Sequence, residues 1–278
     1  MHSLISEGRL STCFRDLRER NAKGLVIYLT AGDPSLEATG KLLEAIEKGG
    51  ADVIELGIPF SDPLADGPVI QRASERALRG GATLRKVLDL LPRWREKLST
   101  PIVLFTYFNP VLQYGLEAFA RAASQAGADA ALIVDLTPEE AAEYIAAMRG
   151  HGLDTVFLAS PTSTDERIER VAAATTGFLY LVSRTGVTGE RQSLSAAAQP
   201  LIQRARRFTK LPLAVGFGIS TPEQVREIQQ FADAAVVGSA VVHVIEERYP
   251  AGGAAAVRDF VGWLKGPTER VGLQPRRQ

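Results

Sequence analysis

The chain has 278 residues, of which 45% are hydrophobic, so it can form one large α/β domain with a sizeable core. Its 32 basic residues balance its 32 acidic residues, which argues against binding to nucleic acid or to an anionic membrane. A single cysteine, Cys13, excludes a disulfide framework and a cysteine-rich metal site. No apolar run is long enough to span a bilayer, and Glu7, Asp16 and Glu19 argue against a signal peptide, so we expect a cytoplasmic protein.

Short apolar runs typical of strands alternate with longer segments typical of helices along most of the chain. A helix is expected over residues 1–21, before the first strand. The expected strands cover residues 24–30, 52–58, 102–105, 131–134, 155–158, 178–182, 213–215 and 235–237. The expected later helices cover residues 36–48, 70–79, 84–97, 116–125, 139–148, 165–173, 194–208, 222–230 and 240–247.

This alternation predicts a parallel sheet, and its length suits a closed (β/α)8 barrel, or TIM barrel, with an extra N-terminal helix. Three strands follow a small-residue helix end with an aspartate, in Gly50-Ala51-Asp52, Gly127-Ala128-Asp129 and Ala232-Asp233. An open doubly wound sheet is the competing architecture, although no Gly-x-Gly-x-x-Gly follows the first strand. We expect a single domain over residues 1–278, with a frayed polar tail at 267–278.

A carboxylate within an apolar strand is the first candidate for chemistry. Glu55 lies inside the second strand, where an unpaired charge costs several kcal/mol or is neutralised. The following loop is stiffened by prolines and carries Asp62 and Asp66. We expect Glu55 and Asp66 to be a catalytic pair. The alternatives are an ion pair for Glu55 and, for Asp66, an ordinary turn before a helix.

Glycines follow the last three strands, at the barrel end where active sites lie. Glycine lets backbone N–H groups approach a ligand closely, and a helix N-terminus favours an anion. We therefore expect a phosphate site, although each glycine alone could simply permit a turn. Its expected members are Gly186, Gly189, Gly216, Gly218, Gly238 and Ser239.

Aromatic side chains near the strand ends are candidates for a pocket wall. Tyr28, Phe105 and Phe217 would line either the core or a flat substrate pocket, and Tyr180 would lie near Glu55. Tyr107 and Asn109 follow the third strand, and Asp135 ends the fourth. The histidines His2, His151 and His243 are far apart, so no metal site is expected.

The segment 55–68 resembles the signature of the tryptophan synthase alpha subunit family. It reads Glu-Leu-Gly-Ile-Pro-Phe-Ser-Asp-Pro-Leu-Ala-Asp-Gly-Pro. Supporting stretches occur along nearly the whole chain, namely Thr30-Ala31-Gly32-Asp33-Pro34, Tyr107-Phe108-Asn109-Pro110, Gly186-Val187-Thr188-Gly189, Gly216-Phe217-Gly218-Ile219-Ser220 and Gly238-Ser239-Ala240. The acidic segment is specific to this family, whereas other phosphate-binding barrels share the glycine stretches.

The resemblance implies a lyase that cleaves indole-3-glycerol phosphate to indole and glyceraldehyde 3-phosphate. It implies that Glu55 is the general acid–base, that Asp66 binds the indole N–H and that Tyr180 lies beside Glu55. It assigns phosphate binding to the glycine loops and Ser239. It also implies a beta subunit partner in an α2β2 tetramer, with pyridoxal phosphate in that partner and no cofactor in this chain.

Two other functions remain open at this point, as does a lyase that releases indole without a beta subunit. Another phosphosugar barrel enzyme, such as an isomerase, would keep the glycines but would not need the acidic loop. A non-catalytic activator of a beta subunit would not need Glu55 and Asp66.

Overall fold

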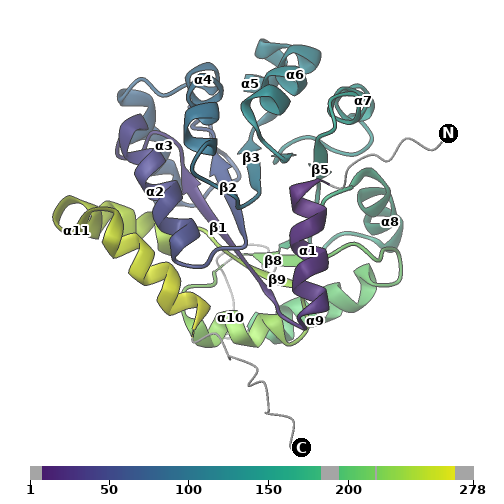
Figure 1. Cartoon of the computed structure of the whole chain (residues 1–278). Coiled ribbons are helices and arrows are strands. Elements are labelled where there is room, and N and C mark those ends of the chain that lie inside the picture. The colour runs from purple at the N-terminus through teal and green to yellow at the C-terminus, as the bar shows by residue number, and fades with distance from the viewer. Residues whose placement is uncertain (1–7, 183–193, 217, 267–278) are drawn as a thin grey trace, which may run out of the picture.

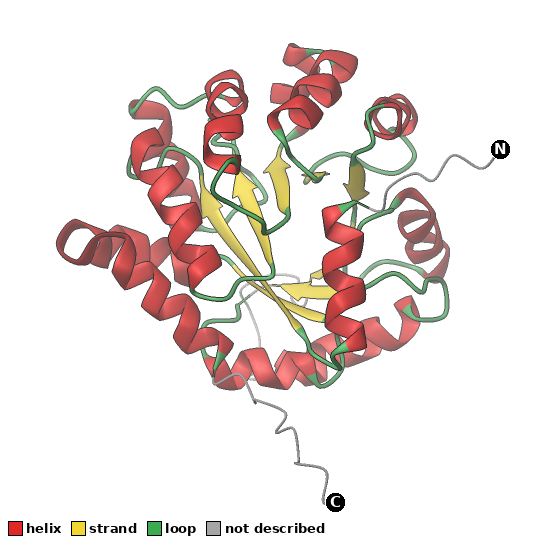
Figure 2. Ribbon diagram, viewed as in Figure 1, coloured by secondary structure: helices red, strands yellow, loops and turns green. Residues whose placement is uncertain are grey.

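The computed structural model describes residues 8–182, 194–216 and 218–266, and it is a ring of parallel strands surrounded by helices (Figures 1 and 2). The strands are β1 (Gly24–Thr30), β2 (Val53–Gly57), β3 (Ile102–Thr106), β4 (Ala130–Ile133), β5 (Asp154–Val156), β6 (Leu158–Ala159), β7 (Leu179–Val182), β8 (Leu213–Gly216) and β9 (Ala234–Val237). The helices are α1 (Arg9–Glu19), α2 (Leu36–Lys48), α3 (Pro68–Arg79), α4 (Leu84–Arg95), α5 (Phe108–Tyr114), α6 (Leu116–Ala126), α7 (Ala142–Gly150), α8 (Asp165–Ala174), α9 (Leu194–Ala205), α10 (Pro222–Gln229) and α11 (Ser239–Lys265).

The barrel closes through a strand that changes partners. The sheet order is β5-β4-β3-β2-β1-β9-β8-β7-β6, and every pair is parallel. The two ends of this order, β5 and β6, are neighbours in the chain and are separated only by Phe157. The expected single strand over 155–158 therefore pairs with β4 through its first part and with β7 through its last part. The nine assigned strands fill the eight positions of a (β/α)8 barrel, which confirms the predicted fold class.

Alternation along each strand divides the core into two. In β1, Leu25, Ile27 and Leu29 pack outward against the helices, whereas Val26 joins the barrel interior. The lower end of the barrel, where the strands begin, is closed by α1. This helix contributes Leu10, Phe14 and Leu17 to the same inner cluster. Figure 1 shows α1 lying across this end of the barrel. The extra N-terminal helix is thus a plug, because an open barrel end would expose the inner apolar side chains to water.

The repeated aspartates before three strands fix the lower rim of the barrel. Each aspartate donates its backbone N–H to the carbonyl of a residue near the start of the adjacent strand. Its carboxylate accepts the N–H of that same residue. The carboxylate contacts are Asp52 with Leu25 at 2.7 Å, Asp129 with Ile102 at 2.8 Å and Asp233 with Leu213 at 2.8 Å. The matching backbone bonds are each 2.9 Å. These aspartates satisfy backbone donors that a strand end would otherwise leave unpaired.

Several element boundaries differ from expectation. Helix α5 was not expected, because a proline interrupts its short sequence; its Phe108 N–H donates to the Asp135 carboxylate at 2.6 Å. Helix α7 begins at Ala142 rather than residue 139, because residues after Thr137 form tight turns. Helix α11 continues to Lys265 through a kink at Gly253, whose φ is +59°.

The expected domain boundaries lie outside the described residues. Residues 1–7 and 267–278 lie outside the described part, so the single domain over 1–278 and the frayed tail stay predictions. Helix α1 covers Arg9–Glu19 of the expected 1–21. Within the described ranges, no helix is both long and apolar enough to cross a bilayer.

Candidate active site

Glu55 lies inside the barrel on β2, flanked in register by Tyr28 of β1 and Val103 of β3. The residue is 1% exposed, and its Oε1 has no hydrogen-bond partner among the described residues. Burial raises the pKa of Glu55 to about 8, because the charged form loses its hydration. At neutral pH this side chain is therefore mainly the protonated acid, and after giving up its proton it is a strong base for a carboxylate.

Asp66 is held in the loop after β2 by three hydrogen bonds around it. The Tyr107 hydroxyl donates to Asp66 Oδ2 at 3.1 Å and accepts the Ala65 N–H at 3.0 Å. The Gln71 side-chain amide donates to the Asp66 carbonyl at 2.8 Å. Burial raises the pKa of Asp66 to about 6, and the Tyr107 hydrogen bond opposes that rise. Asp66 is therefore mostly ionised at neutral pH, whereas Glu55 is mostly protonated.

Two buried tyrosines lie close to both carboxyl groups. The pKa values of Tyr28 and Tyr180 are raised chiefly by burial and further by the charges of Asp66 and Glu55. The Tyr28 ring packs edge-on against Phe105, with the centroids 5.2 Å apart, and its hydroxyl lies 3.3 Å from Thr30 Oγ1. These aromatic side chains place a flat apolar surface near Glu55, and their expected part in a substrate pocket stays a prediction.

The tyrosine hydroxyls occupy space that only glycine leaves open. A Cβ at Gly57 would lie 2.2 Å from the Tyr28 hydroxyl oxygen, and a Cβ at Gly216 would lie 2.2 Å from that of Tyr180. The structure therefore gives a steric reason for glycine at position 216, which the sequence did not reveal. The expected part of Gly216 in phosphate binding is a separate matter and stays a prediction.

The described residues of the expected phosphate site follow or end neighbouring strands. Gly216 of β8 pairs with Val236 of β9, so the segments after these strands are adjacent. Gly218 has φ +80°, a conformation that favours glycine. Gly238 precedes α11, and Ser239 is its first residue. The other expected members, Gly186 and Gly189, lie outside the described residues, as does Phe217, which was expected to line the pocket.

Other polar residues of the sequence analysis have local roles. Asp62 is exposed, and its carboxylate accepts the Ser61 hydroxyl at 2.7 Å. His151 pairs with Glu117, and His243 pairs with Glu247. Within the described ranges, no group of three or more potential ligands is arranged to hold a metal ion.

Tyr107 is the site residue whose role sequence reasoning missed. Its position directly after a strand was noted, but the sequence gave no sign that its hydroxyl reaches Asp66. The only signal was an aromatic residue with a polar tip at the catalytic end of a barrel strand.

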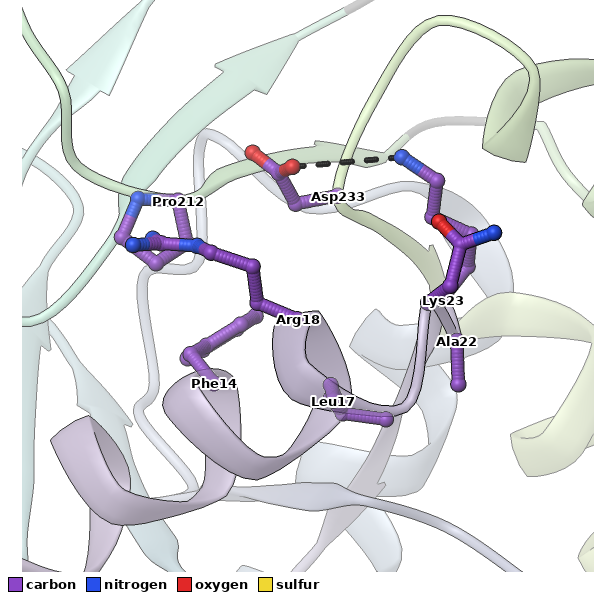
Figure 3. Close-up of a pocket in the computed structure, with 8 residues that line it drawn as sticks. Phe14, Leu17, Arg18, Ala22, Lys23, Pro212 and Asp233 are labelled. Atoms are coloured by element: carbon purple, nitrogen blue, oxygen red, sulfur yellow. Dashed lines mark ion pairs between the residues drawn. The ribbon is translucent and has the colours of Figure 1, made fainter.

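The opposite end of the barrel carries a small pocket of about 80 Å³. Figure 3 shows its lining, which comes from α1, the segment before β1 and the segments before β8 and β9. Lys23 and Asp233 form an ion pair at 3.9 Å across its rim. This pocket lies at the N-terminal ends of the strands, away from Glu55 and Asp66, where barrel residues serve stability.

Comparison with known proteins identifies the family of this chain. A family model described as tryptophan synthase alpha chain matches residues 14–261. The chain belongs to the tryptophan synthase alpha chain family. The resemblance inferred from the acidic segment is confirmed, and the family gives this chain the alpha-subunit role in tryptophan biosynthesis.

Individual alpha chains are similar over most of their length. That of Solibacter usitatus (strain Ellin6076) is 59% identical over 240 residues, which cover 86% of this chain and 89% of the relative. That of Geobacter sulfurreducens is 48% identical over 257 residues, covering 92% of this chain and 97% of the relative. The crystal structure of tryptophan synthase subunit alpha from Legionella pneumophila has a TM-score of 0.85 at 38% identity, over 94% of this chain and 98% of that one. A chain of M. tuberculosis tryptophan synthase in the aminoacrylate-bound form has a TM-score of 0.84 at 37% identity, over 93% of this chain and 98% of that one.

Proposed function

We propose that this alpha chain cleaves indole-3-glycerol phosphate to indole and glyceraldehyde 3-phosphate with Glu55 as acid–base and Asp66 as the group that binds the indole N–H. One observation carries the assignment. Two carboxyl groups at the same barrel end differ in protonation, because Glu55 is fully buried with a pKa of about 8 and Asp66 has a pKa of about 6. Such a separation is what acid and base roles at one pH require.

The reaction needs one proton delivered and another removed. Glu55 gives its proton to indole C3, and the ring becomes an electron sink with positive charge at its nitrogen. The Asp66 carboxylate stabilises that charge through the ring N–H. The Glu55 carboxylate then takes the proton of the adjacent glycerol hydroxyl while the carbon–carbon bond breaks. The bonding electrons return to the ring, indole leaves, and Glu55 is again protonated.

The proposed binding groups surround this pair. Tyr28, Phe105 and Tyr180 offer apolar faces for the indole ring. Phe217, outside the described residues, is assigned to the same binding role from the sequence alone. We assign phosphate binding to Gly238 and Ser239 at the N-terminus of α11. Gly189, Gly216 and Gly218 are assigned to the same phosphate site. A helix N-terminus supplies free N–H groups and a positive dipole end for an anion.

A beta subunit is the proposed partner. Leu64, 93% exposed, lies in the Asp66 loop, and Leu112, 52% exposed, lies on α5 after β3, so both are at the catalytic end. Exposed leucines beside the mouth suit a partner that receives indole there. We assign pyridoxal phosphate to that partner and none to this chain, because Glu55 and Asp66 account for both proton transfers and the charge. An α2β2 assembly and a cytoplasmic location remain predictions.

Indole release from indole-3-glycerol phosphate tests the proposal. We expect slow release by the purified chain and a rise of at least about tenfold on adding a tryptophan synthase beta chain. Leu64→Asp should reduce that rise without changing release by the chain alone. Trp263→Asp is the matched control, because Trp263 is 52% exposed near the end of α11, on the opposite side of the barrel from the mouth. No release with or without the partner would overturn the proposed function, and an unchanged rise with Leu64→Asp would overturn the docking face.

A further inference from the structure

We propose that Tyr107 is a positioning residue for the reaction, whose hydroxyl fixes the Asp66 carboxylate and keeps it ionised for the indole N–H. This inference rests on the proposed function of Asp66. It goes beyond that function, because it names the group that controls Asp66 and the pH range in which the control operates.

The geometry around the Tyr107 hydroxyl supports this role. Tyr107 follows β3 directly and is 4% exposed, and its ring lies 5.2 Å from that of Phe60. The hydroxyl oxygen accepts the Ala65 N–H at 3.0 Å, so its own proton is free to point at Asp66 Oδ2, 3.1 Å away. One phenol thus binds both the backbone before Asp66 and the side chain itself. This arrangement fixes the position of the loop and the direction of the carboxylate.

Among the described residues, the hydrogen bond from Tyr107 is the main interaction that stabilises the ionised form of Asp66. Glu55 from β2, Tyr28 from β1 and Tyr180 from β7 face the same space, and Asp135 after β4 acts on Tyr107. None of these groups is basic, and in the described part of the chain no ion pair involves Asp66. Burial therefore raises the pKa of Asp66 to about 6 against a single opposing hydrogen bond, that from Tyr107.

Removing the hydroxyl should raise the pKa of Asp66 further. A hydrogen bond to a charged group corresponds to about one pKa unit. At pH 6 the ionised fraction of Asp66 would then fall from about a half to about a tenth, and at pH 7 from about nine-tenths to about a half. By pH 8 the difference would nearly vanish.

A purely structural tyrosine would behave differently, and the chain offers one for comparison. Tyr144 on α7 is 2% exposed, and its hydroxyl donates to the Ala131 carbonyl at 3.0 Å. Its ring packs edge-on against Phe157. Tyr144 is therefore as buried as Tyr107 and also has a hydrogen-bonded hydroxyl, but that hydroxyl donates to a backbone carbonyl instead of a carboxylate. Tyr144→Phe should lower stability without altering the pH dependence of turnover.

The experiment compares wild type, Tyr107→Phe and Tyr144→Phe by the pH profile of kcat/KM for indole release, and by 13C NMR titration of the Asp66 carboxyl carbon in the full chain. We expect Tyr107→Phe to lose about fivefold more activity at pH 6 than at pH 8, with the Asp66 midpoint raised by about one unit. Tyr144→Phe should leave both unchanged. An equal loss at every pH with an unchanged Asp66 midpoint would overturn the inference. If wild type releases no indole, the proposed function fails, and the NMR midpoint still decides whether Tyr107 controls Asp66.

Discussion

Glu55 shows how a single side chain carries both the chemistry and a cost in stability. Its apolar neighbours Val53 and Val103 in the barrel interior exclude water from it, and its Oε1 has no partner among the described residues. The same burial that raises its pKa makes it an acid at neutral pH. A residue placed for stability alone would be expected to have this buried oxygen hydrogen-bonded.

This arrangement predicts that stability falls as pH rises through a defined window. The folded protein holds a proton on Glu55 up to about pH 8, whereas an unfolded glutamate loses it near 4.5. Between these values the folded state binds more protons, so the free energy of unfolding decreases with increasing pH. Glu55→Gln removes the titration and should be more stable than wild type at pH 9 by on the order of 2–4 kcal/mol.

Urea unfolding of wild type and Glu55→Gln at pH 5 and pH 9 measures this difference. Glu143→Gln, an exposed position on α7, is the control. Parallel pH dependence for wild type and Glu55→Gln would show that Glu55 does not hold a proton in the folded state.

At the scale of elements, the lower rim depends on side chains that bind neighbouring strands. Asp129 precedes β4, yet its carboxylate accepts the N–H of Ile102 on β3 and the Arg9 guanidinium of α1, at 2.8 and 2.7 Å. Arg9 also donates to the Gly127 carbonyl at 3.0 Å. One aspartate therefore joins two strands to the helix that plugs the barrel.

Asp129→Ala should destabilise the fold by about 2–3 kcal/mol, because it leaves the buried Ile102 N–H without its side-chain acceptor and removes one of the two described contacts of the Arg9 guanidinium. The residual folded enzyme should keep its kcat, because the change lies at the end of the barrel opposite Glu55. Thermal unfolding and indole release measure the two effects, with Asp89→Ala at an exposed position on α4 as the control. A change in kcat without a loss of stability would contradict this structural role.

At the scale of the whole molecule, local patterns were enough to predict the barrel but not its details. Alternating strands and helices predicted the parallel order, and the apolar run around Glu55 predicted a carboxylate within a buried strand. The change of partners at Phe157 could not be predicted, because strand pairing is decided by closure of the ring rather than by residues 155–158 themselves.

The site shows the same division between local and distant information. Glu55 and Asp66 stand out in one short segment, so their residue types and spacing suggested a catalytic pair. The hydrogen bond between Tyr107 and Asp66 joins residues 41 positions apart. The close approach of the Tyr180 hydroxyl to Gly216 depends on packing inside the closed barrel. Neither leaves a periodic pattern in the sequence.

The central claim is that Glu55 performs the proton transfers of indole-3-glycerol phosphate cleavage. Its most direct test is the steady-state rate of indole release by wild type and Glu55→Gln at pH 7, with binding of an indole-bearing phosphate ligand measured on the same samples. We predict that the variant folds and binds the ligand with unchanged affinity, and that its kcat falls by about 10³-fold, within the range for loss of a general acid–base. A folded Glu55→Gln protein that keeps more than about a tenth of the wild-type kcat would contradict the claim.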